Sequence, residues 1–386
     1  MDKNAWSFKS PTSLVFGDNV ALELGAHLNK LGIRKALLVT DELIIKLGIA
    51  KKTLGVATTQ HGVEFATYSG VQPEPPVENA YDALAVYQKE RCDGIVGIGG
   101  GSPLDVAKAV ALLVTNEGKY ENYTGIGKVP KKCAPLVLMP TTSGTGSEVS
   151  MFSIMIVNGA KAGVVDENIT ANLALVDPVL TASAPRHVTA ATGLDAFCHH
   201  LESFLSVNAS VFHQPLCLDG IRVISQYLRK AVGDGQNAQA RYQMAYASTM
   251  GGYASNLSEG AAANHGLAFA LGAKYHIGHG LANAVLLRHV LPIVGRAELE
   301  KVRVVGEAMG EKVASLSDVE ALRVTVRAIH ALVRDVGCDI PLGRLGAREA
   351  DLDDLVAETN KQTRVMGHST YRLSSDEIRS IFAGAL

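Results

Sequence analysis

An unbroken apolar segment that runs into a glycine turn limits most strongly how this chain can fold. Residues 94–98 are apolar or small and lead into Gly99-Gly100-Gly101-Ser102-Pro103. Apolar runs without alternation are typical of parallel strands buried on both faces. Ser102 suits the cap of a following helix and Pro103 its first position. We therefore expect a strand, a tight turn and a helix whose free N–H groups favour a phosphate.

Similar units recur through the first half of the chain. Strand-like runs lie at 13–16, 36–39, 63–68, 135–139 and 173–176, and helical spacing occupies 20–31 and 77–89. Asn158-Gly159 between two further strand-like runs is a strong hairpin signal. Alternating strands and helices predict an α/β domain with a parallel sheet and helices on both faces.

The pattern becomes mostly helical after Ala184-Pro185. A chain of 386 residues is long enough for about two domains. We expect residues 1–184 to form an α/β domain and residues 185–386 a helical domain. An active cleft between two such domains is the simplest arrangement, because each carries part of the expected site.

Two stretches of the second half carry candidate metal ligands. Asp195 and His199 are four residues apart, so they share one face of a helix. His265 and His279 would lie roughly 21 Å apart on one straight helix. The glycines on either side of His279 predict a break that lets the chain fold back. One oxygen and three nitrogens suit Zn²⁺ or Fe²⁺; the alternative for the second stretch is two unrelated histidines on an alanine-rich core helix.

Composition excludes several other classes of function. The net charge of −2 and the 5% aromatic content give no reason to expect nucleic acid or an anionic membrane surface as partner. Five scattered cysteines without a CxxC pair fit a reducing compartment. The first residues lack the apolar run of a signal peptide, and no run of 18 apolar residues suggests a membrane span. We expect a cytoplasmic globular protein.

The combination of motifs resembles a known family. The 99–105 turn, the 140–145 loop Pro-Thr-Thr-Ser-Gly-Thr, the Asp195-x₃-His199 pair, and His265 with His279 occur in this order. Together they resemble the group III, iron-containing alcohol dehydrogenases, which include lactaldehyde reductases and 1,3-propanediol dehydrogenases. The resemblance covers nearly the whole chain. It implies an α/β nucleotide domain, a helical domain, commonly a homodimer, and conversion between primary alcohols and aldehydes with NAD(H) or NADP(H).

The resemblance also implies site residues. One divalent ion, Fe²⁺ or Zn²⁺, would be bound by Asp195, His199, His265 and His279. The cofactor-binding residues would be Gly99, Gly100, Gly101, Ser102, Asp105, Thr141, Thr142, Thr145 and Lys161. From its residues alone, the 140–148 loop could equally be a solvated turn.

Asp41 bears on the choice between the two nicotinamide cofactors. It follows the apolar strand 36–40, where an adenine ribose should lie. A carboxylate there accepts bonds from ribose hydroxyls and repels a 2′-phosphate, which predicts NAD(H). The alternative is that Asp41 only caps the next helix.

Three features depart from the family pattern. Phe269 stands where many relatives have a second histidine that is proposed to move protons. Pro73-Glu74-Pro75 replaces a common Pro-Asn-Pro, and the polar Asn256, Ser258 and Glu259 precede His265. His276 and His200 are then the candidates for a catalytic proton relay; the alternative for each is a supporting or surface position.

We therefore expect a metal-dependent NAD(H) alcohol dehydrogenase or aldehyde reductase for a small primary alcohol or aldehyde. Asn256, Ser258 and Asn264 favour a substrate with a polar or anionic end, such as a hydroxy-, carboxy-, phosphono- or sulfo-aldehyde, because a buried polar group needs a partner. The alternatives are a dehydroquinate synthase-like lyase that uses NAD and a metal, a metallohydrolase, and a non-catalytic binding protein. The metal pattern favours the dehydrogenase, and the glycine turn argues against the hydrolase.

Overall fold

The computed structural model describes residue 6, residues 9–258 and residues 260–386, which form two compact units. The α/β unit comprises Lys9–Thr142 and Gly146–Ala184. The helical unit comprises Trp6, Ser143–Thr145 and the described residues that follow Ala184. The other residues of the predicted first domain, 1–5, 7 and 8, lie outside the described residues, as does Glu259.

A six-stranded parallel sheet forms the centre of the α/β unit, with the strand order β1-β9-β6-β4-β2-β3. Its strands are β1 (Ser13–Phe16), β2 (Lys35–Val39), β3 (Glu64–Tyr68), β4 (Gly94–Gly99), β6 (Leu136–Pro140) and β9 (Leu173–Val176). The predicted parallel sheet is therefore confirmed.

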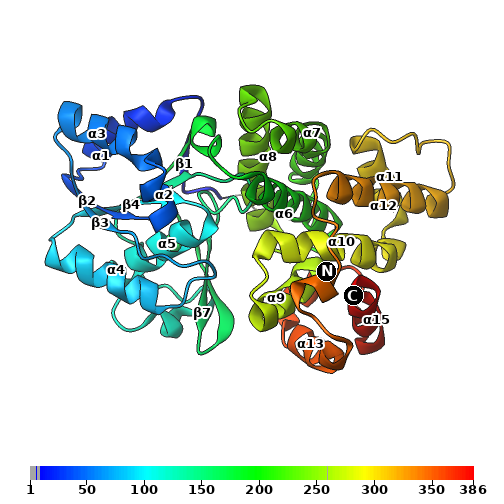
Figure 1. Ribbon diagram of the computed structural model, residues 1–386. Coiled ribbons are helices and arrows are strands. Elements are labelled where there is room, and N and C mark those ends of the chain that lie inside the picture. Colours follow the sequence, from blue (N-terminus) through cyan, green and yellow to red (C-terminus); the bar gives the residue numbers. More distant parts are fainter. Residues whose placement is uncertain (1–5, 7–8, 259) are drawn as a thin grey trace. The chain divides into compact units, whose positions relative to one another are not determined.

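Helices cover both faces of this sheet (Figure 1). One face packs against α1 (Leu24–Lys30) and α3 (Ile49–His61), and the other against α4 (Glu78–Lys89) and α5 (Gly101–Thr115). The short α2 (Glu42–Lys46) follows β2. Leu37 belongs to one core cluster and its neighbour Leu38 to the other. Both faces of the sheet are covered by helices and buried from water, which explains why these strands are apolar without alternation.

A second, three-stranded sheet contains β5 (Gly125–Ile126), β8 (Ala160–Val165) and β7 (Phe152–Val157). The predicted hairpin joins β7 to β8 through Asn158 and Gly159, whose φ angles are 51° and 79°. Positive φ at both positions is what a type I′ turn requires, and Asn-Gly is its preferred pair.

The strand order defines where a ligand should lie on the main sheet. From β2 the chain continues to β3 on one side, and from β4 it continues to β6 on the other side. The strand order therefore reverses between β2 and β4. In open α/β sheets, ligands bind at such a switch point, outside the carboxyl ends of the strands. Asp41 and the glycine turn follow these two strands.

The predicted start of α5 is wrong by two residues. Gly100, not Ser102, is the N-cap residue, and the helix begins at Gly101. The reason lies at Gly99, where φ is 156° and a Cβ atom would lie 2.5 Å from Pro103. A residue without a side chain lets the chain turn earlier than the cap-like serine suggested.

The helical unit is built around α6 (Arg186–Leu205), which packs against α7 (Gln214–Gly233), α8 (Ala238–Leu257), α9 (Ala263–Tyr275) and α10 (His279–Val294) (Figure 1). The later helices are α11 (Leu299–Ala308), α12 (Asp318–Asp335), α13 (Leu352–Asn360), α14 (Thr363–Met366) and α15 (Ser375–Ala385). The predicted helical second half is confirmed. None of the described helices is long and apolar enough to cross a membrane.

The contact between α6 and α7 depends on Gly220. A Cβ atom at this position would lie 2.1 Å from the ring of His200 on α6. We expect Gly220→Ala to lower the free energy of unfolding by about 1–3 kcal/mol, the usual cost of overpacking. Urea unfolding followed by circular dichroism measures the change.

Gly233, at the end of the same helix, is the matched control. A Cβ atom there would have no neighbour within 4 Å. Gly233→Ala should leave stability unchanged or raise it by up to about 1 kcal/mol, because alanine costs less backbone entropy than glycine in a helix. Equal stabilities of the two variants would contradict the tight packing inferred at Gly220.

Candidate metal centre and cofactor turn

Helix α6 presents a row of polar side chains on one face. Asp195, His199 and Glu202 occupy positions i, i+4 and i+7, and Asp195 is only 2% exposed. A helix repeats its face at this spacing, so the three side chains point in a common direction. The sequence prediction found the first two members of the row and missed Glu202.

The predicted break between the two histidine-bearing segments is present. Helix α9 ends at Tyr275, His276 adopts a left-handed conformation with φ 55°, and α10 begins at His279 after Gly278. The reversal brings His279 back to His265, and their ring centroids lie 5.1 Å apart.

Three of the four predicted ligands converge closely. Asp195, His265 and His279 each offer one donor atom within 4.8 Å of the others. Oδ1 of Asp195 lies 3.5 Å from Nε2 of His265 and 3.6 Å from Nε2 of His279. The ring of His199 stacks on that of His265 at 4.8 Å, outside the tight set.

A second set of side chains contacts these groups and orients them. Glu202 Oε1 accepts hydrogen bonds from the backbone N–H of Asn264 at 2.6 Å and of His265 at 3.4 Å, and Oε2 contacts His265 Nδ1. Asn283 donates from Nδ2 to Asp195 Oδ1 at 2.9 Å. A signal for Asn283 was present in the sequence, because it lies four residues after His279 on α10.

The charges of this cluster are strongly coupled. Burial would raise the pKa of Asp195, but the imidazoles of His199 and His279 outweigh it and lower the pKa. Burial also opposes protonation of His265, yet the carboxylates of Glu202 and Asp195 raise the pKa of His265 to about 9. The carboxylates of Glu202 and Asp195 therefore stabilise a positive charge at the position of His265.

A divalent cation fits these donors. His199 Nδ1 and His265 Nε2 are buried, and the described residues offer them no hydrogen-bond partner. Unpaired buried polar atoms are costly unless something binds them. Imidazole nitrogens with one carboxylate oxygen form a typical donor set for Zn²⁺ or Fe²⁺. Asp195, His199, His265 and His279 can thus hold one ion.

An aromatic side chain borders the cluster. The ring of Phe269, one turn after His265 on α9, stacks on His279 at 5.5 Å between centroids and meets His265 edge-on at 6.3 Å. An apolar wall beside the donors excludes water and limits the room for a substrate.

The glycine turn lies at the carboxyl end of β4, where α5 begins. Gly99, Gly100, Gly101 and Ser102 therefore lie at a helix N-terminus, whose free N–H groups favour a phosphate. Thr141 donates its backbone N–H to the carbonyl of Gly99 at 2.9 Å, and Thr142 lies beside Gly100. The structure brings these six predicted residues together; Thr145 belongs to the helical unit.

Asp105 lies elsewhere. Its carboxylate accepts bonds from Ser147 Oγ at 2.7 Å and from the Ile154 backbone N–H at 3.1 Å, and burial raises its pKa. These bonds tie α5 to β7, so the side chain is committed to the unit's own structure. Asp41 caps α2 by accepting the Ile44 N–H through Oδ1 at 2.9 Å, the alternative noted from the sequence.

Lys161 pairs with Glu74 at 2.6 Å. Lys161 was predicted to contact the cofactor. Glu74 replaces the asparagine of the Pro-Asn-Pro motif that is common in the family. Glu74 has a φ of 49°, which is uncommon for a residue other than glycine or asparagine.

The two histidines considered as proton relays occupy different environments. His200 is fully buried and donates from Nε2 to the Ala247 carbonyl at 2.8 Å, and burial lowers its pKa to about 4. It packs in the core of the unit and not beside the donors. His276 is exposed at the end of α9.

The expected polar substrate contacts are not all available. Ser258 is fully buried and bonds to Ser203 Oγ at 2.9 Å. Asn264 donates to Asn283 Oδ1 at 3.0 Å. The argument that a polar substrate is needed is therefore wrong for Ser258. For Asn264 only the amide N–H group has a partner, because its buried Oδ1 has none among the described residues.

Comparison with known proteins identifies the family. The family model described as iron-containing alcohol dehydrogenase matches residues 11–178, and that of the Fe-containing alcohol dehydrogenase family, C-terminal, matches residues 189–386. The chain belongs to the iron-containing alcohol dehydrogenase family. It is thus a metal-dependent oxidoreductase that interconverts alcohols and aldehydes.

Individual members of the family are similar over their full lengths. Long-chain-alcohol dehydrogenase 1 of Geobacillus thermodenitrificans is 38% identical over 94% of this chain and 92% of its own. The crystal structure of a 1,3-propanediol oxidoreductase has a TM-score of 0.95 and 35% identity, covering 99% of this chain and 100% of the other. Sulfoacetaldehyde reductase from Bifidobacterium kashiwanohense, in complex with NAD⁺, has a TM-score of 0.88 and 26% identity, covering 99% and 98%.

The convergence of donors in this iron-containing alcohol dehydrogenase predicts the effect of removing one. His265→Ala should lower metal affinity by more than about 100-fold, which exceeds the usual loss from an outer partner, and should abolish turnover in the folded protein. Metal content after dialysis, measured by mass spectrometry, tests this.

His276→Asn is the control for that measurement. The side chain is exposed, and asparagine tolerates the left-handed conformation at this position. It should keep a full complement of metal. A fully metallated His265→Ala protein would contradict the assignment.

Proposed function

We propose that the chain interconverts a short primary alcohol and its aldehyde, with Asp195, His199, His265 and His279 as the ligands of one divalent ion. The main support is the convergence of three of these donors within 4.8 Å in a buried cluster. Either Fe²⁺ or Zn²⁺ suits one oxygen and three nitrogens.

The ion supplies Lewis acidity for the substrate oxygen, and NAD(H) supplies the hydride chemistry. The protein's own residues position these groups. Phe269 keeps water from one side of the donors, and the start of α5 binds the cofactor phosphates through backbone N–H groups. His276 is the exposed candidate to pass the substrate hydroxyl proton to solvent, because His200 is held in the core.

The substrate is proposed to be short, of about two to four carbons, because the Phe269 ring occupies space next to the donors. The names of similar proteins span long-chain alcohols, 1,3-propanediol and sulfoacetaldehyde. The last two are small and polar, which supports a short substrate with a polar or anionic end.

Two further proposals concern the oligomeric state of the protein and its cellular compartment. A homodimer is proposed from the resemblance to a family in which homodimers are common. A cytoplasmic location is supported by the five cysteines, all buried and without disulfides, because secreted proteins usually pair theirs.

NAD(H) is proposed over NADP(H) because Asp41 follows β2 at the switch point of the sheet. Asp41→Asn keeps an N-cap of equal quality and removes the charge. We expect the ratio of kcat/KM for NADPH to that for NADH to rise by about tenfold, or about 1.4 kcal/mol. Wild-type protein that uses both cofactors equally would refute the role of Asp41.

An aldehyde panel with NADH, after separate loading with Fe²⁺ and Zn²⁺, tests the reaction and the substrate. Net NADH consumption distinguishes a dehydrogenase from a lyase. We expect higher kcat/KM for short polar aldehydes than for pentanal or hexanal.

Phe269→Ala should shift the preference toward hexanal by about tenfold or more. This is the discrimination that a hydrophobic pocket typically achieves for one or two methylene groups of a substrate. A wild-type kcat/KM that rises steadily with chain length would show that the pocket is not short.

A further inference from the structure

Glu202 connects two of the three ligand-bearing helices directly and the third through Asn264. It lies on α6, its Oε1 accepts two backbone N–H groups at the start of α9, and its Oε2 contacts the ring of His265. A carboxylate at a helix N-terminus is also favoured by the helix dipole. Asn264 continues the connection to α10, where it donates to Asn283.

These contacts determine which ring nitrogen of His265 carries a proton. Two N–H donors occupy Oε1, so the carboxylate is oriented with Oε2 toward Nδ1. A carboxylate only accepts hydrogen bonds, which requires the proton to be on Nδ1. The lone pair of Nε2 then faces Asp195 Oδ1, 3.5 Å away. Two electron-rich atoms at that distance repel each other unless a proton on Nε2, or a metal ion that replaces it, lies between them.

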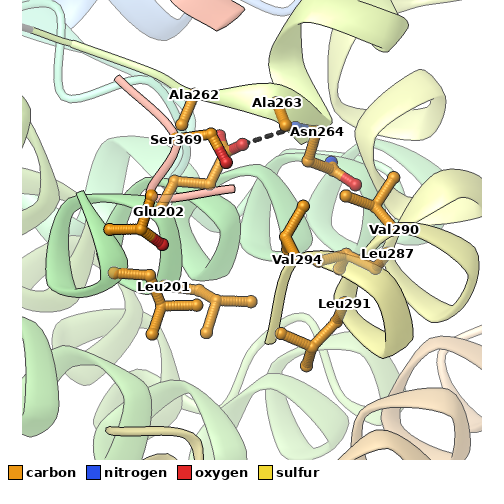
Figure 2. Close-up of a pocket in the computed structure, with 12 residues that line it drawn as sticks. Leu201, Glu202, Ala262, Ala263, Asn264, Leu287, Val290, Leu291, Val294 and Ser369 are labelled. Atoms are coloured by element: carbon orange, nitrogen blue, oxygen red, sulfur yellow. Dashed lines mark hydrogen bonds between the residues drawn. The ribbon is translucent and has the colours of Figure 1, made fainter. Parts of the chain in front are cut away.

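The surroundings of Glu202 strengthen this effect. Figure 2 shows its bond to Asn264 within a small pocket of about 30 Å³ whose other walls include Leu201, Leu287 and Val290. That volume holds on the order of two water molecules. With so little water and mostly apolar walls, the hydrogen bonds of the carboxylate are stronger than they would be at the surface.

We propose that Glu202 is a positioning residue for the metal: it holds His265 as the Nδ1–H tautomer and so presents Nε2 as the ligand. This inference rests on the proposed metal site. Glu202 itself touches neither metal nor substrate in this role; it acts through His265. Partners of this kind typically change metal affinity by about 10–100-fold.

The test is Glu202→Gln, measured by competition between the purified protein and a chelator for Zn²⁺. If the glutamine oxygen faces Nδ1, its amide hydrogens face the two backbone donors. If the amide is flipped, it donates to Nδ1 and moves the ring proton to Nε2. The first arrangement is disfavoured because N–H groups face N–H groups, and the second places the proton on the ligand nitrogen, so we expect about 10–100-fold weaker Zn²⁺ affinity. Glu202→Asp keeps the charge and should recover part of the loss.

Ser203→Ala is the matched control, since Ser203 is the adjacent buried residue on α6 and bonds to Ser258 rather than to a ligand. It removes a buried hydrogen bond from the same helix and should leave Zn²⁺ affinity unchanged. Folded Glu202→Gln protein with wild-type affinity would overturn the proposal.

A second measurement needs no variant. Histidine ¹⁵N NMR of the Zn²⁺-loaded wild-type protein should show one ligand histidine, absent in His265→Ala, with its proton on Nδ1. A proton on Nε2 instead would overturn the inference while leaving the metal site intact. Wild-type protein that fails to bind Zn²⁺, or binds it as well without His265, would refute the proposed site itself.

Discussion

The buried carboxylate of Asp195 is the constraint on which the helical unit depends. An isolated ionised carboxylate cannot be moved out of water without large compensation. Asn283 donates to one of its oxygens, and the imidazoles of His265 and His279 lie within 3.6 Å. Because these partners come from α9 and α10, the charge on α6 requires three helices to meet. Packing and the candidate chemistry therefore share one cause.

The break between α9 and α10 makes that meeting possible. His276 ends α9 in a left-handed conformation, and Gly278 precedes the first residue of α10. Without this reversal His265 and His279 would lie roughly 21 Å apart. The sequence carried the necessary signal, because glycines on both sides of one histidine are improbable inside a continuous helix. The break, the facing histidines and the parallel sheet were all predictable for this reason: each follows from local pattern.

The features that could not be predicted concern the choice of partners. Ser258 and Asn264 carry polar groups near His265, and spacing alone cannot tell whether a substrate or another side chain satisfies them. The structure gives their partners as Ser203 and Asn283. Glu202 was overlooked although it continues the row of Asp195 and His199, because a glutamate on a helix is most often solvated. The early start of α5 depends on how Gly99 packs against Pro103, which is a contact and not a pattern.

The two units build their sites from different parts of the chain. In the α/β unit the proposed phosphate-binding groups are backbone N–H groups at the start of α5, so glycine is needed for access. We therefore expect substitution of Asp41 to change cofactor preference without removing the proposed phosphate site. In the helical unit the candidate donors are side chains, and two of them, Asp195 and His265, contact a second side chain that orients them. We therefore expect a single substitution next to the candidate ligands, at Glu202 or Asn283, to affect the chemistry, whereas the backbone site depends on the turn itself and on its hydrogen bond from Thr141.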